Sequence, residues 1–334
     1  MCPSSIISLL SAALDERMDL LDPHHWSAIR LFNGFLEGDP DLGVDLYADT
    51  LVFHNNADPP QEAEGKVQEA RNYFLNHLPW VKTIIVKARY ANTPEARRGI
   101  IVHGETAARR VREGNAWYAL DLQLNQDTSF YLDTRNLRIW AAGHLSGKQV
   151  LNAFAYTGSL GVAAMAGGAS RVLHIDRNKA FLNVAKTSYT LNGFPIHKSD
   201  FYVGDFFSTV GTLNRSKALF DCVFLDPPFF SVTGKGTVDL LSENARLINK
   251  VRPLIADNGW LAAVNNALFL SGADYLRSLE ALCADGYLSI EELIPVPPDC
   301  TGYPKTRLRS LPADPAPFNH ATKIAVLRVK RKAG

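Results

Sequence analysis

The pattern of hydrophobic and polar positions changes partway along this chain of 334 residues. From residue 148 onward, short apolar segments alternate with longer segments in which apolar residues recur at helical spacing. Alternating strands and helices are typical of a parallel sheet with helices on both faces. The pattern predicts strands at 149–154, 171–175, 200–203, 220–225, 260–264, 288–294 and 323–329, and helices at 159–166, 179–192, 238–254 and 272–283.

The first part of the chain has a mixed pattern. Period-two alternation predicts short strands, at 44–47, 50–54, 83–89 and 99–103, and helical spacing predicts a helix over 62–78. Residues 6–21 also have helical spacing but carry three acids, which is unlike a signal or transit peptide. We therefore expect an N-terminal helix in 1–22, a small α+β domain with possible RNA-binding function in 23–120, and a catalytic domain in 121–334.

Composition narrows the class of protein. With 46% hydrophobic and 21% charged residues, the chain resembles an ordinary globular protein, and its net charge of +1 excludes a polycation. No apolar run reaches the roughly 18 residues of a membrane span. Four cysteines lack metal-ligand spacing, so we expect no metal and a reducing, cytoplasmic compartment. Contacts with nucleic acid would have to come from local basic residues: Lys82, Lys87, Arg89, Arg97, Arg98 and the tail 328–332.

The strand at 220–225 ends in the motif Asp226-Pro227-Pro228-Phe229. The prolines stop strand pairing, and the acid and the ring remain at the carboxyl end, where open α/β sheets bind ligands. Asp/Asn-Pro-Pro-aromatic at a strand end resembles the signature of S-adenosylmethionine (SAM) enzymes that methylate nucleobases. The alternative is a surface loop with a chance Asp-Pro-Pro.

The turn after the first strand of this domain is the next candidate. It contains Gly158, which lets the backbone approach a ligand closely, followed by a helix N-terminus. The turn lacks the Gly-x-Gly-x-x-Gly fingerprint, so a dinucleotide oxidoreductase is disfavoured. Gly158 is therefore a candidate for a cofactor contact, and the alternative is a tight strand–helix turn without a ligand.

Two further strands end in acids. Asp176 follows the second strand, at a spacing that suits a carboxylate accepting hydrogen bonds from ribose hydroxyls. The alternative role for Asp176 is a helix N-cap. Asp205 and Phe206 follow the third strand, where the acid could accept the adenine amino group and the ring could cover the base. The alternative for Asp205 is a loop acid without a ligand.

The segment 124–138 makes the resemblance more specific. Its residues Gln126, Thr128, Phe130, Leu132, Asp133, Arg135 and Arg138 match the Gly-Gln-x-Thr-Gly-Phe-Phe-Leu-Asp-Gln-Arg-x-Asn-Arg segment of bacterial 23S rRNA methyltransferases of the RlmI and RlmK kind. Ser129, Thr134 and Leu137 depart from that pattern, as does Ser188 further on. The resemblance spans residues 28–334 and has no counterpart to the family's N-terminal PUA module.

The resemblance implies a Rossmann-like class I methyltransferase fold with a seven-stranded mixed sheet, preceded by a small α+β domain. It also implies SAM as cofactor and RNA, specifically 23S rRNA, as partner, whereas it implies nothing about oligomeric state. The turn after the first strand, Asn152-x-Phe154-x-Tyr156-Thr157-Gly158, is also similar to the SAM loop of that family. The cofactor-binding set that the resemblance implies consists of this turn, Asp176, Asp205 and Phe206, together with Thr128, Phe130, Asp133, Arg135, Arg177 and Asp226.

The atom that receives the methyl group is a separate question. Methylation at pyrimidine carbon-5 needs a nucleophile such as cysteine, but the segment 262–267 contains no thiol and Cys300 is the only plausible substitute. Asn265-Asn266 instead resembles the guanine-N7 branch, where the acceptor has its own lone pair. We therefore favour guanine N7 of large-subunit rRNA, with Asp226, Pro227, Pro228, Phe229 and Asn266 as the catalytic set.

Other functions stay open at this point. Guanine N2 and cytosine C5 of rRNA are alternative acceptors, because Asp-Pro-Pro-Phe also occurs in guanine-N2 enzymes. A small-molecule or protein methyltransferase is a further alternative. From a different class, the chain could be an RNA-binding ribosome assembly factor with a decayed active site.

Overall fold

The computed structural model describes residues 5–311 and 314–331 and divides into two compact units. The first unit contains Met1–Leu132 and Pro297–Leu311, and the second contains Asp133–Val296 and Pro312–Gly334. The first unit thus extends past residue 120, where we expected the boundary, and a late segment of the chain returns to it. No change of composition marks that return in the sequence.

The first unit is an α+β structure built on a five-stranded sheet, in the order β1-β2-β3-β4-β5. Strands β3 and β4 are parallel and are connected by α3, whereas the other neighbours are antiparallel. Apolar residues of α1 and α3 pack with the strands in one core. The elements are α1 (Ile6–Asp15), β1 (Ala28–Phe32), α2 (Gly34–Glu37), β2 (Leu42–Tyr47), β3 (Thr50–Asn55), α3 (Glu64–His77), β4 (Thr83–Ala88), α4 (Pro94–Arg98), β5 (Ile100–His103), the hairpin β6 (Arg110–Glu113) and β7 (Ala116–Ala119), and α11 (Pro298–Thr301).

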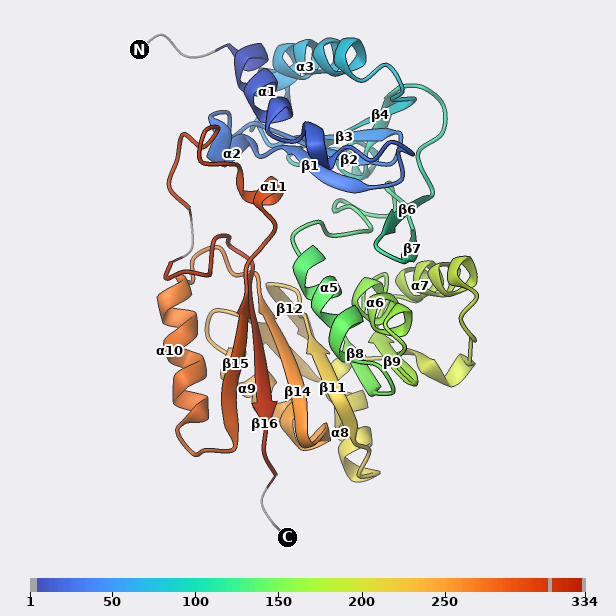
Figure 1. Ribbon diagram of the computed structural model, residues 1–334, viewed down its shortest axis with the longest axis vertical. Coiled ribbons are helices and arrows are strands. Elements are labelled where there is room, and N and C mark those ends of the chain that lie inside the picture. The colour runs from blue at the N-terminus through green and yellow to red at the C-terminus, as the bar shows by residue number, and fades with distance from the viewer. Residues whose placement is uncertain (1–4, 312–313, 332–334) are drawn as a thin grey trace. The chain divides into compact units, whose positions relative to one another are not determined.

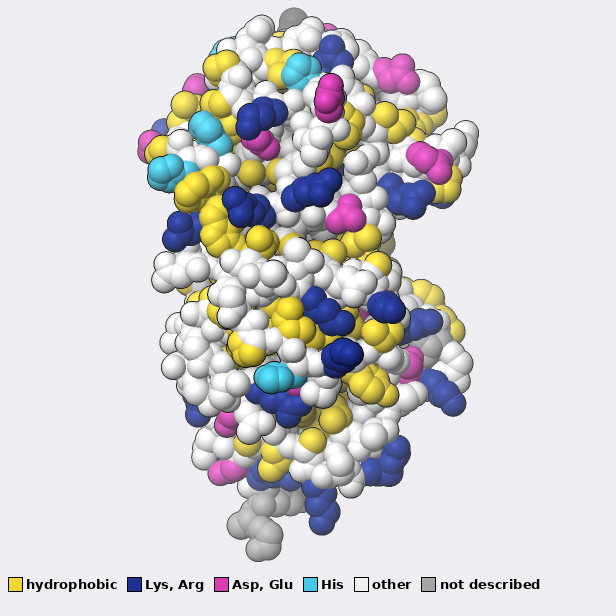
Figure 2. Space-filling model, turned by 90° about the vertical axis from the view of Figure 1, so that its right-hand side faces the viewer, with side chains coloured by type: hydrophobic (Ala, Val, Ile, Leu, Met, Phe, Trp, Pro, Cys, Tyr) yellow, Lys and Arg dark blue, Asp and Glu magenta, His cyan; other side chains and the backbone are white. Residues whose placement is uncertain are grey.

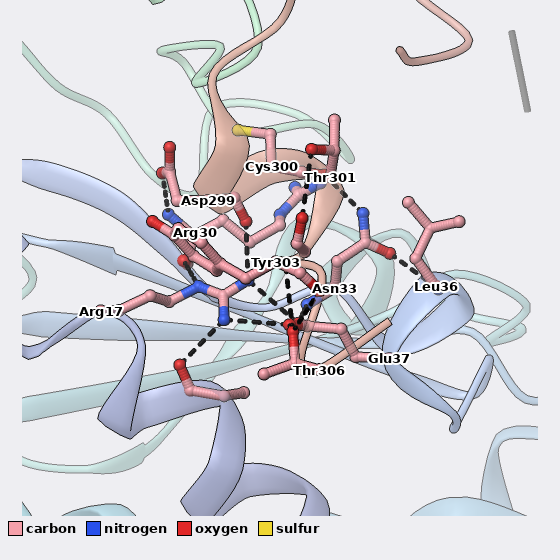
Figure 3. Close-up of polar contacts among 12 residues, drawn as sticks. Arg17, Arg30, Asn33, Leu36, Glu37, Asp299, Cys300, Thr301, Tyr303 and Thr306 are labelled. Carbon is pink, nitrogen blue, oxygen red and sulfur yellow. Dashed lines mark hydrogen bonds and ion pairs between the residues drawn. The ribbon is translucent and has the colours of Figure 1, made fainter. Parts of the chain in front are cut away.

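A buried guanidinium ties the returning segment to this unit (Figure 3). Arg17, which follows α1, donates to both carboxylate oxygens of Glu37 at 3.0 Å and to the carbonyl of Asp299 at 2.9 Å. Glu37 also accepts from the backbone of Asn33 and contacts the hydroxyl of Thr306. Removing one partner of such a buried pair typically costs about 3–5 kcal/mol, so these contacts explain why residues 297–311 fold with the first unit.

The second unit has a seven-stranded sheet in the order β10-β9-β8-β11-β14-β16-β15. All neighbours are parallel except β16, which is antiparallel to β14 and β15. This mixed sheet confirms the predicted class I methyltransferase fold. The strands are β8 (Gln149–Ala153), β9 (Arg171–Asp176), β10 (Phe201–Val203), β11 (Phe220–Leu225), β14 (Ile255–Asn265), β15 (Leu288–Ile294) and β16 (Lys323–Val329).

Helices cover both faces of this sheet (Figure 1). Successive residues of a strand point to opposite faces, and along β11 Cys222 and Phe224 pack with α5 and α6 whereas Val223 and Leu225 pack with α8, α9 and α10. The two faces therefore have separate cores. The helices are α5 (Arg135–His144), α6 (Ser159–Ala166), α7 (Lys179–Asn192), α8 (Phe206–Arg215), α9 (Asn244–Val251) and α10 (Gly272–Cys283). In the described parts of the chain, no helix is long and apolar enough to cross a membrane.

The helix predicted over 238–254 is wrong in its first half. Residues 230–239 form a hairpin of β12 (Phe230–Thr233) and β13 (Gly236–Asp239), and a helix begins only at Asn244. The register pairs Thr233 with Gly236, which leaves the two-residue turn Gly234-Lys235. Glycine followed by a polar residue between two short strands is a hairpin signal. Helices α5 and α8 were not predicted either.

Candidate cofactor and substrate site

The candidate residues of the second unit follow strands that end at one edge of the sheet. Strand β8 lies between β9 and β11, and all three are parallel. Asp176 ends β9 and Asp226 follows β11, so the two acids flank the loop that follows β8. This is the edge at which open α/β sheets bind ligands.

The loop after β8 has an unusual backbone. Phe154, Tyr156 and Gly158 all have positive φ angles, of 57°, 50° and 80°. Residues other than glycine rarely adopt this conformation, which costs of order 1–3 kcal/mol and is associated with functional sites. Gly158 is required for a second reason, because a Cβ there would lie 2.6 Å from the Cβ of Ala185. The loop is thus a preformed backbone surface.

Asp176 holds this loop in place. Its Oδ2 accepts from the backbone N–H of Tyr156 and its Oδ1 from that of Asn178, both at 2.8 Å. The N-cap of α7 is Asn178, whose side chain accepts from Ala180, so Asp176 does not serve as the cap. Burial raises the pKa of Asp176 above its usual value, although the backbone hydrogen bonds oppose the shift. Each carboxylate oxygen can accept further hydrogen bonds, and the ribose contact stays a prediction.

A buried polar network lies beneath the loop. The Asn152 side chain is 1% exposed and its amide contacts Nδ1 of His174 at 3.3 Å. The other ring nitrogen contacts the hydroxyl of Tyr189 at 2.9 Å. Burial lowers the pKa of His174 to about 3, so the ring is neutral, with Nδ1 accepting from the amide and Nε2–H donating to the phenol. Asn152 therefore supports the loop from below, and its direct contact with SAM stays a prediction.

Asp205 and Phe206 begin α8. Asp205 is the N-cap, and its side chain accepts from the backbone of Ser208 at 3.1 Å. Phe206 is 3% exposed and stacks on Phe154 with ring centroids 4.4 Å apart. Phe206 thus lies in the core, and half-buried Phe154 is the more exposed ring of the pair. An adenine contact by these residues stays a prediction.

Asp226 is a carboxyl group whose pKa is raised close to neutral pH. Burial, together with the negative charge of Asp133, raises the pKa of this half-buried carboxyl to about 7. Asp133 itself accepts from the hydroxyl of Thr322 at 2.6 Å. Two neighbouring carboxyls that repel each other form a site for a cation. SAM carries a positive ammonium and a positive sulfonium, so these residues fit the cofactor.

The end of β14 supplies a different polar group. Asn265 is fully buried, donates to the carbonyl of Leu240 at 3.1 Å and accepts from the backbone of Ala267 at 3.0 Å. It thus caps the end of the strand, which is the alternative to a substrate contact for such a pair of asparagines. In Asn266, Oδ1 is buried and has no hydrogen-bond partner in the described part of the chain. Buried acceptors are rarely left in this state, so Asn266 has an acceptor available for a ligand.

Lys323 is a site-proximal residue that sequence reasoning missed. It begins β16, is fully buried, and its Nζ donates to the carbonyl of Ala267 at 3.0 Å and to that of Ala321 at 2.5 Å. Burial lowers the pKa of the Lys323 ammonium to about 8. The signal available in the sequence was a lone lysine next to four apolar residues, which we took only as a strand boundary.

The remaining assigned residues are distributed over both units. Thr128 and Phe130 belong to the first unit, where the hydroxyl of Tyr47 contacts Oγ1 of Thr128 at 2.9 Å and donates to the carbonyl of Phe130 at 3.0 Å. In the second unit, Asp133 neighbours Asp226. Arg135 is half-buried, Thr157 is buried and Arg177 is exposed. Their cofactor contacts stay predictions.

The basic residues considered for RNA contact differ in availability. Lys87, which we expected among the residues able to contact RNA, is not available: it is 3% exposed, and its Nζ donates to the carbonyls of Arg98 at 2.6 Å and Asn125 at 2.9 Å. It therefore stabilises the first unit. In the tail, Arg328 pairs with Glu291 at 2.5 Å, and residue 332 lies outside the described residues. Figure 2 shows one face on which Lys and Arg side chains are interspersed with hydrophobic and acidic ones.

Comparisons with known proteins agree with this geometry. A family model described as S-adenosylmethionine-dependent methyltransferase matches residues 82–311. The ribosomal RNA large subunit methyltransferase I of Alteromonas mediterranea is 27% identical over 81% of this chain and 68% of its own length. The methyltransferase K/L of Alcanivorax borkumensis is 32% identical, over 66% of this chain but 32% of its own length.

A solved structure shows the same fold. The protein SMU.776, crystallised with SAH, superposes with a TM-score of 0.83 at 22% identity, covering 97% of this chain and 81% of its own. These matches confirm the predicted resemblance and SAM as cofactor. The chain spans about a third of the K/L relative, so the comparison with that protein concerns only part of it.

The first prediction concerns the ribose contact. Asp176→Ala should weaken SAM binding by about tenfold or more, because charge-assisted hydrogen bonds contribute about 1.5–3 kcal/mol each, and calorimetry measures this. Asn178→Ala is the matched control: it removes the cap of α7, at about 1 kcal/mol of stability, and should leave SAM affinity unchanged. Normal SAM binding by Asp176→Ala would refute the assignment.

The second prediction concerns pH. The pKa of Asp226 is raised to about 7, so this carboxyl is protonated below that pH and cannot attract a cation. SAM affinity should therefore rise with pH and level off above pH 7, with a fall of up to about tenfold per unit on the acid side. Calorimetry in buffers of different ionisation enthalpy should detect proton release on binding. Asp226→Asn should bind more weakly and lose this pH dependence; a flat profile in the parent protein would contradict the prediction.

Proposed function

The chain belongs to the S-adenosylmethionine-dependent methyltransferase family, and from this premise we propose that it methylates a base of large-subunit ribosomal RNA in the cytoplasm. The observation that carries the proposal is the end of β11, where a half-buried acid is followed by Pro227, Pro228 and the exposed ring of Phe229. A cation site beside an exposed ring suits an enzyme that holds SAM and a planar acceptor side by side. The names of the relatives favour rRNA as the source of that acceptor.

The cofactor would be held by residues of the second unit. Asp176 would accept from the ribose, Phe154 would pack on the adenine, and Asp226 would attract the cationic end. The bound cofactor supplies an electrophilic methyl group. The protein's own part is to orient both reactants and to exclude water, which suits an acceptor that already has a lone pair.

The acceptor favoured by this arrangement is guanine N7. Phe229, at 40% exposure, is available to stack on a base that has left its helix. The unpartnered Oδ1 of Asn266 can accept a hydrogen bond from the N–H groups at the edge of guanine. N7 itself carries an in-plane lone pair, so no residue has to remove a proton before attack.

Guanine N2 is the second candidate, because one observation favours it. An acid with a pKa of about 7 is suited to accept a proton near neutral pH, and an exocyclic amine must lose one. Asp226 would then act as a base. Cytosine C5 is less favoured, because Cys222 and Cys300 are fully buried and burial raises the pKa of the Cys222 thiol.

Mass spectrometry of rRNA nucleosides tests the proposal. Cells lacking the gene should lose one 7-methylguanine from the large-subunit RNA, and restoring the gene, but not its Asp226→Ala variant, should return it. Loss of N2-methylguanine would select the second candidate. Identical rRNA nucleosides with and without the gene would contradict the proposal and favour a small-molecule or protein substrate, or an assembly factor.

The third prediction excludes a covalent cysteine mechanism. Cys222→Ala and Cys300→Ala should both retain methyl transfer, because neither thiol is accessible or activated. RNA containing 5-fluorocytosine should form no stable adduct with the parent protein on a denaturing gel. An adduct that disappears in one of the two variants would restore the cytosine interpretation.

The fourth prediction concerns base stacking. Neighbouring residues after a strand end tend to face opposite ways, which predicts that one of the two rings after Asp-Pro-Pro points inward. That prediction is wrong, because Phe229 and Phe230 are 40% and 57% exposed and neither is a core residue. The free energy of unfolding of both alanine variants should therefore lie within about 0.5 kcal/mol of that of the parent. Phe229→Ala should lose methylation by roughly tenfold to a hundredfold, since base stacking contributes about 1–3 kcal/mol. Parent-like RNA methylation by Phe229→Ala at normal SAM affinity would refute the stacking role.

A further inference from the structure

The turn that follows β14 exposes two large apolar side chains. Leu268 and Phe269 are 69% and 84% exposed, whereas Ala267 is fully buried and Leu270 packs against the core formed with α8, α9 and α10. The backbone N–H of Leu270 donates to the carbonyl of Ala267 at 3.4 Å and closes the turn. The two ends of the turn are anchored and its tip points into solvent.

The anchoring is stronger than a surface loop requires. The carbonyl of Ala267 accepts from the buried ammonium of Lys323 at 3.0 Å, and its N–H donates to Oδ1 of Asn265. On the other side, Ser271 caps α10 by accepting from the backbone of Asp274. Burying an ammonium is costly, and the contacts of this one hold the turn and the start of β16. The tip is therefore presented by a rigid base.

The exposed tip follows a strand that neighbours β11. Strands β11 and β14 are parallel and paired, so their carboxyl ends lie at the same edge of the sheet, and the Asn265 amide donates to the carbonyl of Leu240, which follows the hairpin. Clusters of exposed apolar side chains usually mark an interaction site. The exposed members on the hairpin side are Phe229, Phe230, Val232 and Leu241.

We propose that Leu268 and Phe269 form a wedge that enters the base stack of a structured RNA and fills the space left by the nucleotide presented to Asp226 and Asn266. The inference rests on the proposed function and deepens it. An enzyme that acts on a stacked base must extrude it, and apolar side chains inserted between base steps are a common means of holding stacked nucleic acid open. The wedge directly follows Asn266, whose unpartnered acceptor points to a ligand at this strand end.

The occupant is RNA rather than a second protein because of where the surface lies. The wedge follows β14 and the Asp226 motif follows the neighbouring strand β11, so a protein bound over the wedge would compete with the acceptor base. A second copy of this chain would cover the same residues and block methyl transfer. Both would be revealed by the measurements below.

The test uses the full chain and two RNAs with the same target sequence, one in which the target is stacked in a hairpin stem and one that is unstructured. The double variant Leu268→Ala, Phe269→Ala should lose about tenfold to a hundredfold in methylation rate on the hairpin, since unstacking a step costs a few kcal/mol, and remain within twofold on the unstructured strand. Its SAM affinity and melting temperature should equal those of the parent. Ile139→Ala on α5 is the matched control, because that side chain is 59% exposed, and should change neither rate.

A spectroscopic measurement separates a wedge from a general binding surface. With 2-aminopurine next to the target and SAH present, the parent should raise the fluorescence of the hairpin, the double variant should not, and Phe269→Trp should restore the rise. Equal losses on both RNAs, no loss on either, or a changed oligomeric state in the double variant would each overturn the wedge alone. A parent protein that methylates neither RNA would overturn the proposed function and the wedge with it.

Discussion

The hydrogen bond from the backbone of Tyr156 to Asp176 is the contact on which the cofactor side of the sheet depends. It joins the loop after β8 to the end of β9 at 2.8 Å. It helps to compensate the positive φ angles of Phe154 and Tyr156, which cost about 1–3 kcal/mol per residue, together with the bond from the backbone of Ala155 to the carbonyl of Ile175 at 2.8 Å. The same carboxylate is the one we assign to the ribose. One side chain would thus preorganise the loop and bind the cofactor, so changes to it affect both functions together.

Buried polar groups stabilise the strand ends at two other places. His174 lies below the loop after β8 as a neutral ring, and Lys323 lies below the turn after β14, where it donates to backbone carbonyls. Burial lowers the pKa of both groups, to about 3 and about 8. Such groups are costly unless they are hydrogen-bonded. The bonds of Lys323 fix the backbone of the turn, and those of His174 fix the side chains of Asn152 and Tyr189, which an apolar side chain of the same size would not do.

Local patterns predicted the elements whose determinants are close in the sequence. The helices α6, α7 and α10 begin and end at the predicted residues. The side chains of Asn178 and Ser271 cap α7 and α10, which also have regular apolar spacing, whereas α6 begins after Gly158 without a side-chain cap and has apolar residues on all sides. The end of β11 was likewise predicted from the sequence, since proline interrupts the pairing of a strand.

The errors depend on contacts between distant residues. Lys87 was expected to be available to RNA, but carbonyls from two other segments enclose it. The return of 297–311 to the first unit rests on Arg17 meeting Asp299, at a separation of 282 residues. The roles of His174 and Lys323 also follow from burial by neighbouring strands. Periodicity reports whether a segment has a buried face, whereas the partner of a buried polar group is set by tertiary packing.

The charge on Asp226 bears on the choice between the two guanine atoms. Its pKa of about 7 comes from burial and from repulsion by Asp133, without a bound cation. A cation bound beside these carboxyls would favour the charged form and lower that pKa. Asp226 would then be a weaker base than it is in the cofactor-free protein, and its oxygens would be committed to the cofactor. An acceptor that must lose a proton would gain little from such a group, whereas guanine N7 needs none. On the proposed arrangement, the raised pKa of Asp226 therefore does not make it a base, and guanine N7 is the favoured acceptor. Asp226 serves as counter-ion to the cofactor, and Asn266 and Phe229 orient the acceptor.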